Sequence, residues 1–155
     1  MFGVVSLTLL YAYRALRRRF NEPAVPRSLN RTALNGVLFL AAYCSTGPFA
    51  HFGFWLAVAL TGLWALRVLL YRENRSTIAL SLLIAILGPI GEIMVAMMGM
   101  FHYTDPDFGS VHSWLPAVYL HGGLVVASVD AFLTSKRHPE PMVSDTSEEF
   151  HNRTS

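Results

Sequence analysis

The segment Thr77–Phe101 is a run of 25 residues in which Glu92 is the only ionisable side chain. At about 1.5 Å per residue, an α-helix of this length reaches about 37 Å, more than the roughly 30 Å hydrocarbon core of a bilayer. The run therefore predicts a membrane-spanning helix. A carboxylate within such a span is costly to bury and usually faces protein or trapped water, so Glu92 is a candidate functional residue.

Four further apolar stretches share this character, at about residues 2–16, 32–47, 51–71 and 114–134. Charged residues make up only 14% of the chain, against about 25% in soluble domains. The predicted fold class is all-α, an integral membrane helical bundle of four or five transmembrane helices over residues 1–134. The first stretch is short for a bilayer, so a truncated span or an interfacial helix is the alternative. Residues 135–155 are polar and are predicted to form a disordered tail.

The basic residues indicate how the bundle is oriented. All twelve lysines and arginines lie on or near one side of the five-span scheme, which holds the 14–31 linker, the 72–76 loop and the tail. None lies in the 47–50 or 102–113 connections. By the positive-inside rule the basic side is cytoplasmic, which places the amino terminus outside and the tail inside. Because the charges flank apolar spans instead of forming a polar face, we expect membrane lipids, and no nucleic acid, as partners.

Two polar side chains are predicted to lie at the same depth in the membrane. Glu92 is about three residues beyond the centre of its span, and His121 is about three residues before the centre of the next, antiparallel span. At equal depth the two groups can share a proton, which lowers the free energy of burying either one. We therefore expect Glu92 and His121 to pair, either as a catalytic acid and its partner or as a packing hydrogen bond.

A second polar layer is predicted nearer the cytoplasm. Arg67, Asp130 and Asn35 lie on three different spans, each about five or six residues inward of the centre of its span. We expect Arg67 and Asp130 to form a structural ion pair with Asn35 beside it. The alternative is that each charged side chain extends to the membrane surface.

The connection at 102–113 and the start of the next span contain candidate substrate-binding residues. They are His102, Asp105, Asp107 and Trp114, which we expect at the mouth of a site on the outer side. The segment Asp105–Gly109 has the composition of a tight turn, with Gly109 as the residue that permits an unusual backbone conformation. The histidines and aspartates lack the HxxxH, HxxHH and HExxH spacings of zinc or iron sites, so we predict no metal.

One stretch resembles a known kind of membrane protein. The order Gly-Pro-x-Gly-Glu, then Pro-Asp-Phe-Gly, then Trp-Leu-Pro, covers Gly88 to Pro116. This order resembles the carboxy-terminal half of certain small polytopic membrane proteins. The resemblance implies a helical membrane bundle and brings no activity with it.

The sequence contains no nucleophile motif, nucleotide-binding loop or histidine box, so we predict no cofactor. The leading hypothesis is an enzyme or binding protein for an apolar substrate such as an isoprenoid, sterol or lipid. A buried carboxyl is a competent acid, so Glu92 would catalyse isomerisation or cyclisation with His121 as its partner. The competing hypothesis is a non-catalytic structural or assembly subunit of a membrane complex. A third is a proton-coupled carrier, which for so short a chain would require a homo-oligomer.

Overall fold

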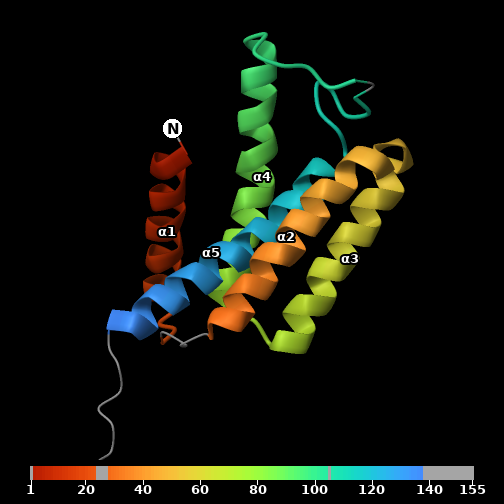
Figure 1. The fold of residues 1–155 in the computed structure, drawn as a ribbon. Coiled ribbons are helices and arrows are strands. Elements are labelled where there is room, and N and C mark those ends of the chain that lie inside the picture. Colours follow the sequence, from red (N-terminus) through yellow and green to blue (C-terminus); the bar gives the residue numbers. More distant parts are fainter. Residues whose placement is uncertain (1, 24–27, 105, 138–155) are drawn as a thin grey trace, which may run out of the picture.

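A computed structural model describes residues 2–23, 28–104 and 106–137 of the chain (Figure 1). Over these residues the chain forms long α-helices joined by short connections, and the predicted all-α fold class is confirmed. The helices are α1 (Phe2–Arg19), α2 (Leu29–Phe49), the 3-10 helix η1 (Ala50–Phe52), α3 (Phe54–Tyr71), α4 (Arg75–Met97) and α5 (Leu115–Arg137). Residues 135–137, predicted to belong to the disordered tail, instead form the end of α5, and residues 138–155 lie outside the described residues.

Within the described residues, four helices are long and apolar enough to cross a membrane. They are α2 with η1, α3, α4 and α5. The helix α1 does not reach this hydropathy, since Arg14 and the three arginines that end it lie within its last two turns. The chain is an integral multi-pass membrane protein. The side of the bundle at which α1, α3 and α5 end and α2 and α4 begin carries the basic residues (Figure 1).

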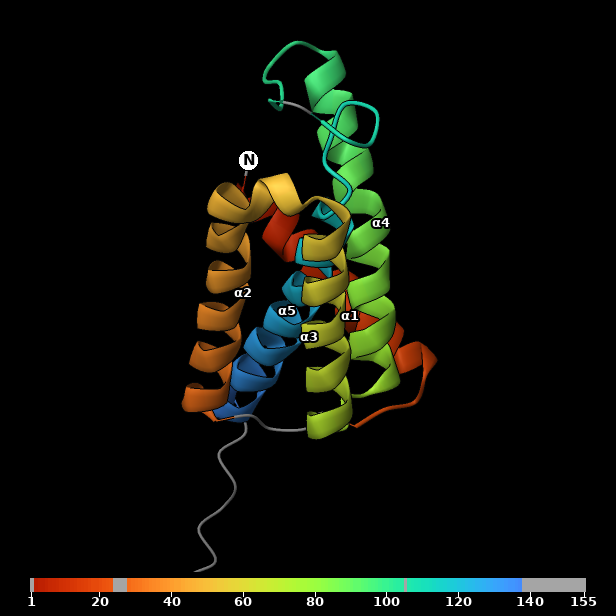
Figure 2. The same ribbon diagram turned by 90° about the vertical axis from the view of Figure 1, so that its right-hand side faces the viewer.

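Helix α5 lies at the centre of the bundle and packs against α1, α2, α3 and α4. Of its membrane-crossing stretch 56% is buried, against 17% to 22% for the other three. Figures 1 and 2 show α5 running obliquely between α1 on one side and α2 and α3 on the other. Its central position follows from small side chains on several of its faces, because they let neighbouring backbones approach closely.

Two glycines set how α4 and α5 pack. At Gly123 in α5, an added Cβ atom would lie 2.3 Å from Ser81 Oγ and 2.6 Å from Ser81 Cα in α4. At Gly88 in α4, it would lie 2.7 Å from the ring of Tyr119 in α5. These contacts fix the register of the two antiparallel helices, so that Gly88 is level with Tyr119 and Ser81 with Gly123. We call the end of the bundle opposite the basic residues its outer end, and there α4 extends beyond the other helices (Figure 1).

The apolar core has two parts. The outer part lies beneath the connection between α4 and α5 and includes Leu56, Leu60, Trp114 and Val118. The inner part docks α1 onto α4 and α5 and is built from Tyr13, Leu80, Ile84 and Ala127. In the connection between α4 and α5, Gly109 has the expected unusual conformation, with a φ of +60°. The turn that contains it runs from Phe108 to Val111, which exchange backbone hydrogen bonds of 3.0 and 3.1 Å, and so lies later than the expected Asp105–Gly109.

Candidate functional site

The carboxylate of Glu92 accepts two tyrosine hydrogen bonds. Tyr119 of α5 donates its hydroxyl to Oε1 at 2.6 Å, and Tyr103 of the outer connection donates to Oε2. Hydrogen bonds to a carboxylate are roughly twice as strong as those between neutral groups. Glu92 of α4 therefore joins the connection between α4 and α5, through Tyr103, to α5, through Tyr119. Partial burial, followed by the hydrogen bond to Glu92, raises the pKa of Tyr103 above its ordinary value.

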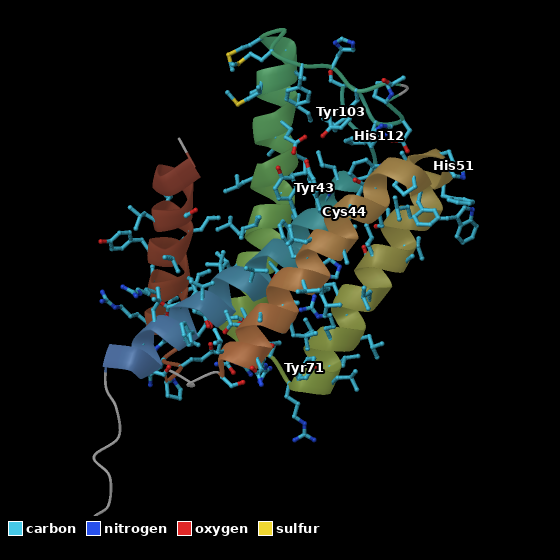
Figure 3. The ribbon with its side chains drawn as sticks, viewed as in Figure 1. Tyr43, Cys44, His51, Tyr71, Tyr103 and His112 are labelled. Carbon is cyan, nitrogen blue, oxygen red and sulfur yellow. The ribbon has the colours of Figure 1, made fainter. Side chains whose placement is uncertain are left out.

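Glu92 lies in the wall of a pocket of about 800 Å³ at the outer ends of α2 and α5. Five of the eleven residues in this wall are Phe, Tyr or Trp, and Figure 3 labels Tyr43 and Cys44 of α2 on one side with Tyr103 on the other. We call this the aromatic pocket; its walls also include Phe101, His102, Trp114, Leu115 and Tyr119. The volume is that of a drug-sized ligand site, for which the range is about 300–1,000 Å³.

The side chain of Trp114 has a ring held by aromatic neighbours and an indole N–H that makes no hydrogen bond to the described residues. Its ring stacks on His112 with the centroids 5.1 Å apart, and Tyr103 meets it edge-on at 6.4 Å. The indole Nε1 is buried and has no hydrogen-bond partner among the described residues. A buried unpaired donor costs about 1–3 kcal/mol, and such groups call for an explanation such as a ligand or water. Of the expected binding residues, Trp114 and His102 therefore line the pocket.

Asp107 lies in a neighbouring cavity of about 500 Å³, together with His51 and His112. Ser113 donates its backbone N–H to Oδ1 at 2.6 Å and its hydroxyl to Oδ2 at 2.5 Å. Gly53, whose φ is +43°, leaves room for the Asp107 carboxylate. A Cβ atom added to Gly53 would lie only 3.0 Å from Oδ2 of Asp107. Asp107 thus anchors the outer connection instead of facing the aromatic pocket. Asp105 lies outside the described residues.

The outer connection is expected to loosen in acid. Partial desolvation alone would raise the pKa of Asp107, but the hydrogen bonds from Ser113 and the nearby His112 outweigh it and hold that pKa below 3.8. The carboxylate therefore stabilises the folded connection above about pH 4, and this contribution is lost as pH falls through the lowered pKa. Following the Ser113 amide by NMR during an acid titration should give a midpoint below 3.8. Asp107→Asn should abolish that transition, and a midpoint at or above 3.8 would contradict the assignment.

The expected pairing of Glu92 with His121 is wrong. His121 is fully buried beside α3, where Nε2 is 3.0 Å from the carbonyl oxygen of Leu60 and Nδ1 is 3.0 Å from Nη1 of Arg67. A guanidinium only donates, so Nδ1 must accept and Nε2 must carry the proton. The depth estimate assumed that both spans were centred at the midplane. In the packed register Glu92 instead lies outward of Tyr119.

The expected ion pair of Arg67 with Asp130 is also wrong, although Arg67 and Asn35 do meet. Arg67 donates to Oδ1 of Asn35, and Nδ2 of Asn35 donates to Oγ of Ser128. Ser128 in turn donates to the carbonyl oxygen of Leu124 at 2.7 Å. A buried polar network therefore links α2, α3 and α5, and it includes His121 as its fourth side chain.

Asp130 instead faces α1. Its Oδ1 accepts from Nε of Arg14 at 2.6 Å and its Oδ2 from Nη1 of Arg17 at 3.0 Å. His121 and Asp130 are nine residues apart, which places them on opposite sides of α5. The spacing of Arg14 and Arg17, one helical turn apart, was the available signal for this interaction.

The sequence reasoning also missed both hydrogen-bond donors to Glu92. Tyr103 lies two residues after the apolar run Thr77–Phe101, and nothing in the sequence singles it out as a partner of Glu92. Tyr119 lies one turn into α5 and became visible as a partner only once the packing of Gly88 against its ring was known. Within the described ranges, no group of three or more His, Cys, Asp and Glu residues is placed to hold a metal ion.

Comparison with known proteins gives a partial match. No protein-family model and no solved structure matches the chain. A segment of 74 residues is 32% identical to insulin-induced gene 1 protein of Homo sapiens and of Bos taurus, and 34% identical to that of Danio rerio. It covers 48% of this chain and 25%, 25% and 28% of those proteins, respectively. The chain thus spans about a quarter of the length of the curated relatives it matches, and it is similar to that part of them.

Proposed function

We propose that the protein binds a sterol, or another lipid with one small polar group, in the aromatic pocket. The observation that supports this most directly is the make-up of the pocket wall, in which five Phe, Tyr or Trp side chains and Leu115 lie beside the Glu92 carboxylate. Ligand sites of this kind bury an apolar body against rings and orient it through a few polar groups. A sterol or isoprenoid alcohol has an apolar body with a single hydroxyl, which matches that arrangement.

Two polar groups of the pocket suit the ligand hydroxyl. The Glu92 carboxylate has lone pairs beyond the two that Tyr103 and Tyr119 occupy, because its two oxygens offer about four acceptor sites. The hydroxyl would donate to one of them. The indole N–H of Trp114, buried without a partner among the described residues, would donate to the hydroxyl oxygen or to a carbonyl of the ligand.

Binding fits this site better than acid catalysis does. Both oxygens of Glu92 accept hydrogen bonds from tyrosine hydroxyls, which hold the carboxylate in place in the pocket wall. His121, the expected proton partner, is engaged with Arg67 and Leu60. The names of the similar proteins specify no ligand and no reaction. The contacts of Glu92 and His121 therefore support ligand binding better than isomerisation or cyclisation by the expected acid pair.

Alkylation of Cys44 offers a direct test. It is the only cysteine of the chain, it is exposed, and it lines the aromatic pocket. Purified protein in detergent would be treated with N-ethylmaleimide with and without cholesterol, and the modification followed by intact-protein mass spectrometry. At a sterol concentration about ten times Kd, we expect about tenfold slower alkylation, because only the unoccupied fraction reacts.

A matched control separates pocket occupancy from general effects of the sterol on detergent. In the double variant Cys44→Ser with Leu69→Cys, the single thiol lies on α3 at a position that is 74% exposed. Its alkylation should not change with cholesterol. Equal rates at Cys44 with and without sterol would overturn the proposal and favour a structural subunit. Protection that instead follows pH and not sterol would favour the carrier.

A further inference from the structure

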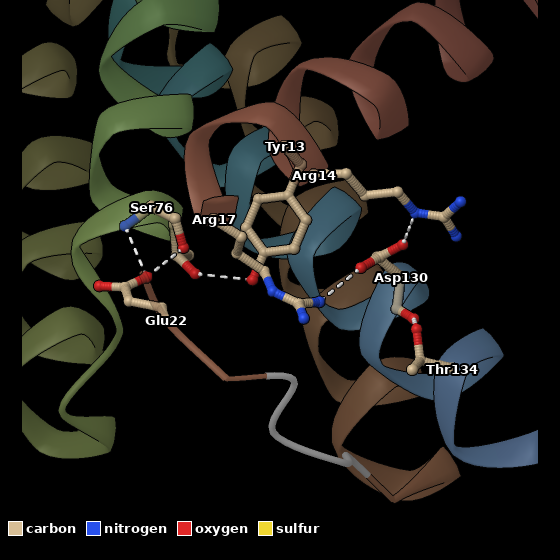
Figure 4. A network of polar contacts seen from close by, with 8 residues as sticks. Tyr13, Arg14, Arg17, Glu22, Ser76, Asp130 and Thr134 are labelled. Carbon is tan, nitrogen blue, oxygen red and sulfur yellow. Dashed lines mark hydrogen bonds and ion pairs between the residues drawn. The ribbon is translucent and has the colours of Figure 1, made fainter. Parts of the chain in front are cut away.

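A second cavity lies on the opposite side of the bundle, where α1 and α5 end. Its volume is about 320 Å³, and its walls include Arg14, Arg17, Arg18, Asp130 and Thr134. Figure 4 shows Arg14 and Arg17 converging on Asp130 from one face of α1. We call this the arginine cavity. It shares no wall residue with the aromatic pocket.

The arginine cavity keeps an excess of positive charge. Arg14 and Arg17 share the one carboxylate of Asp130, which is fully buried, and Arg18 adds a third guanidinium. The other carboxylate in the wall, Glu22, accepts hydrogen bonds from the start of α4. The cavity wall therefore holds three cations and two carboxylates, and one of the carboxylates, Asp130, is shared between two of the cations.

Glu22 is stabilised by the first turn of α4. Its Oε1 accepts the backbone N–H of Arg75 at 2.9 Å, and its Oε2 accepts the N–H and the hydroxyl of Ser76 at 3.1 and 2.5 Å (Figure 4). The amino terminus of a helix carries a partial positive charge, which offsets a carboxylate placed there. The start of α4 therefore offsets part of the negative charge that Glu22 brings to the cavity wall.

Donors also remain unused. A guanidinium has five N–H donors, and in the contacts with Asp130 Arg14 uses Nε and Arg17 uses Nη1. The Nε of Arg17 is buried and has no partner among the described residues. Arg17 is held in place by Asp130 and lies over the ring of Tyr13, 6.0 Å from the centroid. The cavity is thus a preformed set of oriented cationic donors.

We propose that the arginine cavity binds the phosphate of an anionic phospholipid. Planar guanidiniums bind phosphate oxygens in pairs, and basic pockets between membrane helices on the cytoplasmic side are suited to anionic headgroups. A lipid is favoured over a soluble phosphate because apolar side chains of α1, Leu7 at 57% and Tyr11 at 70% exposure, continue from the cavity along the membrane. Acyl chains would lie along that surface while the phosphate enters the cavity.

The test measures lipid binding by native mass spectrometry of the full-length protein. Phosphatidic acid is the probe, phosphatidylcholine is the zwitterionic control, and glycerol 3-phosphate is the soluble competitor. We expect phosphatidic acid adducts that phosphatidylcholine does not match. Arg18→Gln should weaken them about fivefold, because one cation near the membrane contributes about 1 kcal/mol to the binding of an anionic lipid. Arg18 is exposed and makes no contact with Asp130 in the structure, so this variant should fold.

The matched control is Arg72→Gln, which removes an equally exposed charge on the same side, at the end of α3 and away from the cavity. Affinity should then be unchanged. Equal weakening by both variants would mean general surface charge and would overturn the site. Displacement of the lipid by micromolar glycerol 3-phosphate would make it a soluble-phosphate site and overturn the lipid assignment. Neither outcome bears on cholesterol protection of Cys44, which concerns the other pocket.

Discussion

Gly123→Ala is expected to destabilise the folded protein by about 3 kcal/mol, in the upper part of the range for an overpacked core. The new methyl carbon would lie 2.6 Å from Ser81 Cα, and because that atom is backbone, relief requires α4 and α5 to move apart. The other four α-helices all pack on α5, so the displacement is expected to spread through the bundle.

The neighbouring glycine gives a matched control. A Cβ at Gly122 would meet only Phe39 Cε2, at 3.8 Å, which is ordinary contact. Gly122→Ala is therefore expected to be neutral or to stabilise by up to about 1 kcal/mol through helix propensity. Unfolding in sodium dodecyl sulfate, followed by circular dichroism, would measure both variants. If the two variants unfolded alike, the close approach of α4 and α5 at Ser81 would be refuted.

Arg67→Met is expected to destabilise the protein by about 3–5 kcal/mol, the range for breaking a buried charged interaction by removing one partner. The substitution leaves Oδ1 of Asn35 and Nδ1 of His121 without their donor in the centre of the bundle. Each buried acceptor left unpaired accounts for about 1–3 kcal/mol. The same detergent titration would measure the loss. Arg72→Met, at an exposed position, should change stability by less than about 0.5 kcal/mol.

A combined variant separates the two possible origins of that loss. Adding Asn35→Leu and His121→Leu to Arg67→Met removes the orphaned acceptors along with the cation. If unpaired acceptors cause the loss, the triple variant should recover much of the stability, as replacement of buried ionic groups by apolar ones often does. A triple variant less stable than Arg67→Met would show that the polar side chains pack in a way leucine cannot reproduce.

The helices could be predicted from the sequence because the membrane requires it. A run as apolar as Thr77–Phe101 must satisfy its backbone internally, and α4 indeed forms over Arg75–Met97. The central position of α5 could not be predicted in this way. Its apolar stretch is no more hydrophobic than that of α4, and what distinguishes it is the glycine contact at Gly123, which depends on the register.

The partners of the buried polar side chains were predicted less well, because two side chains at the same depth in the membrane need not face each other. Asn35 and Arg67 were placed in one layer and do meet. Asp130, placed in the same layer, faces the opposite way around α5 and pairs with Arg14 and Arg17. Anticipating that required knowing that α1 docks beside α5, and the linker between α1 and α2 gives no sequence signal for the position of α1.

All hydrogen bonds in the network around Arg67 are donated in the direction away from the guanidinium, and this affects whether the network can carry a proton. Hydrogen bonds run outward from the guanidinium on both sides, through His121 to the carbonyl of Leu60 and through Asn35 and Ser128 to the carbonyl of Leu124. Passing a proton along it would require the imidazole to change tautomer and the amide to flip against a cation that cannot release its own proton. The hydrogen-bond network at the centre of the bundle is therefore not expected to conduct protons. This argues against a proton-coupled carrier that uses this route.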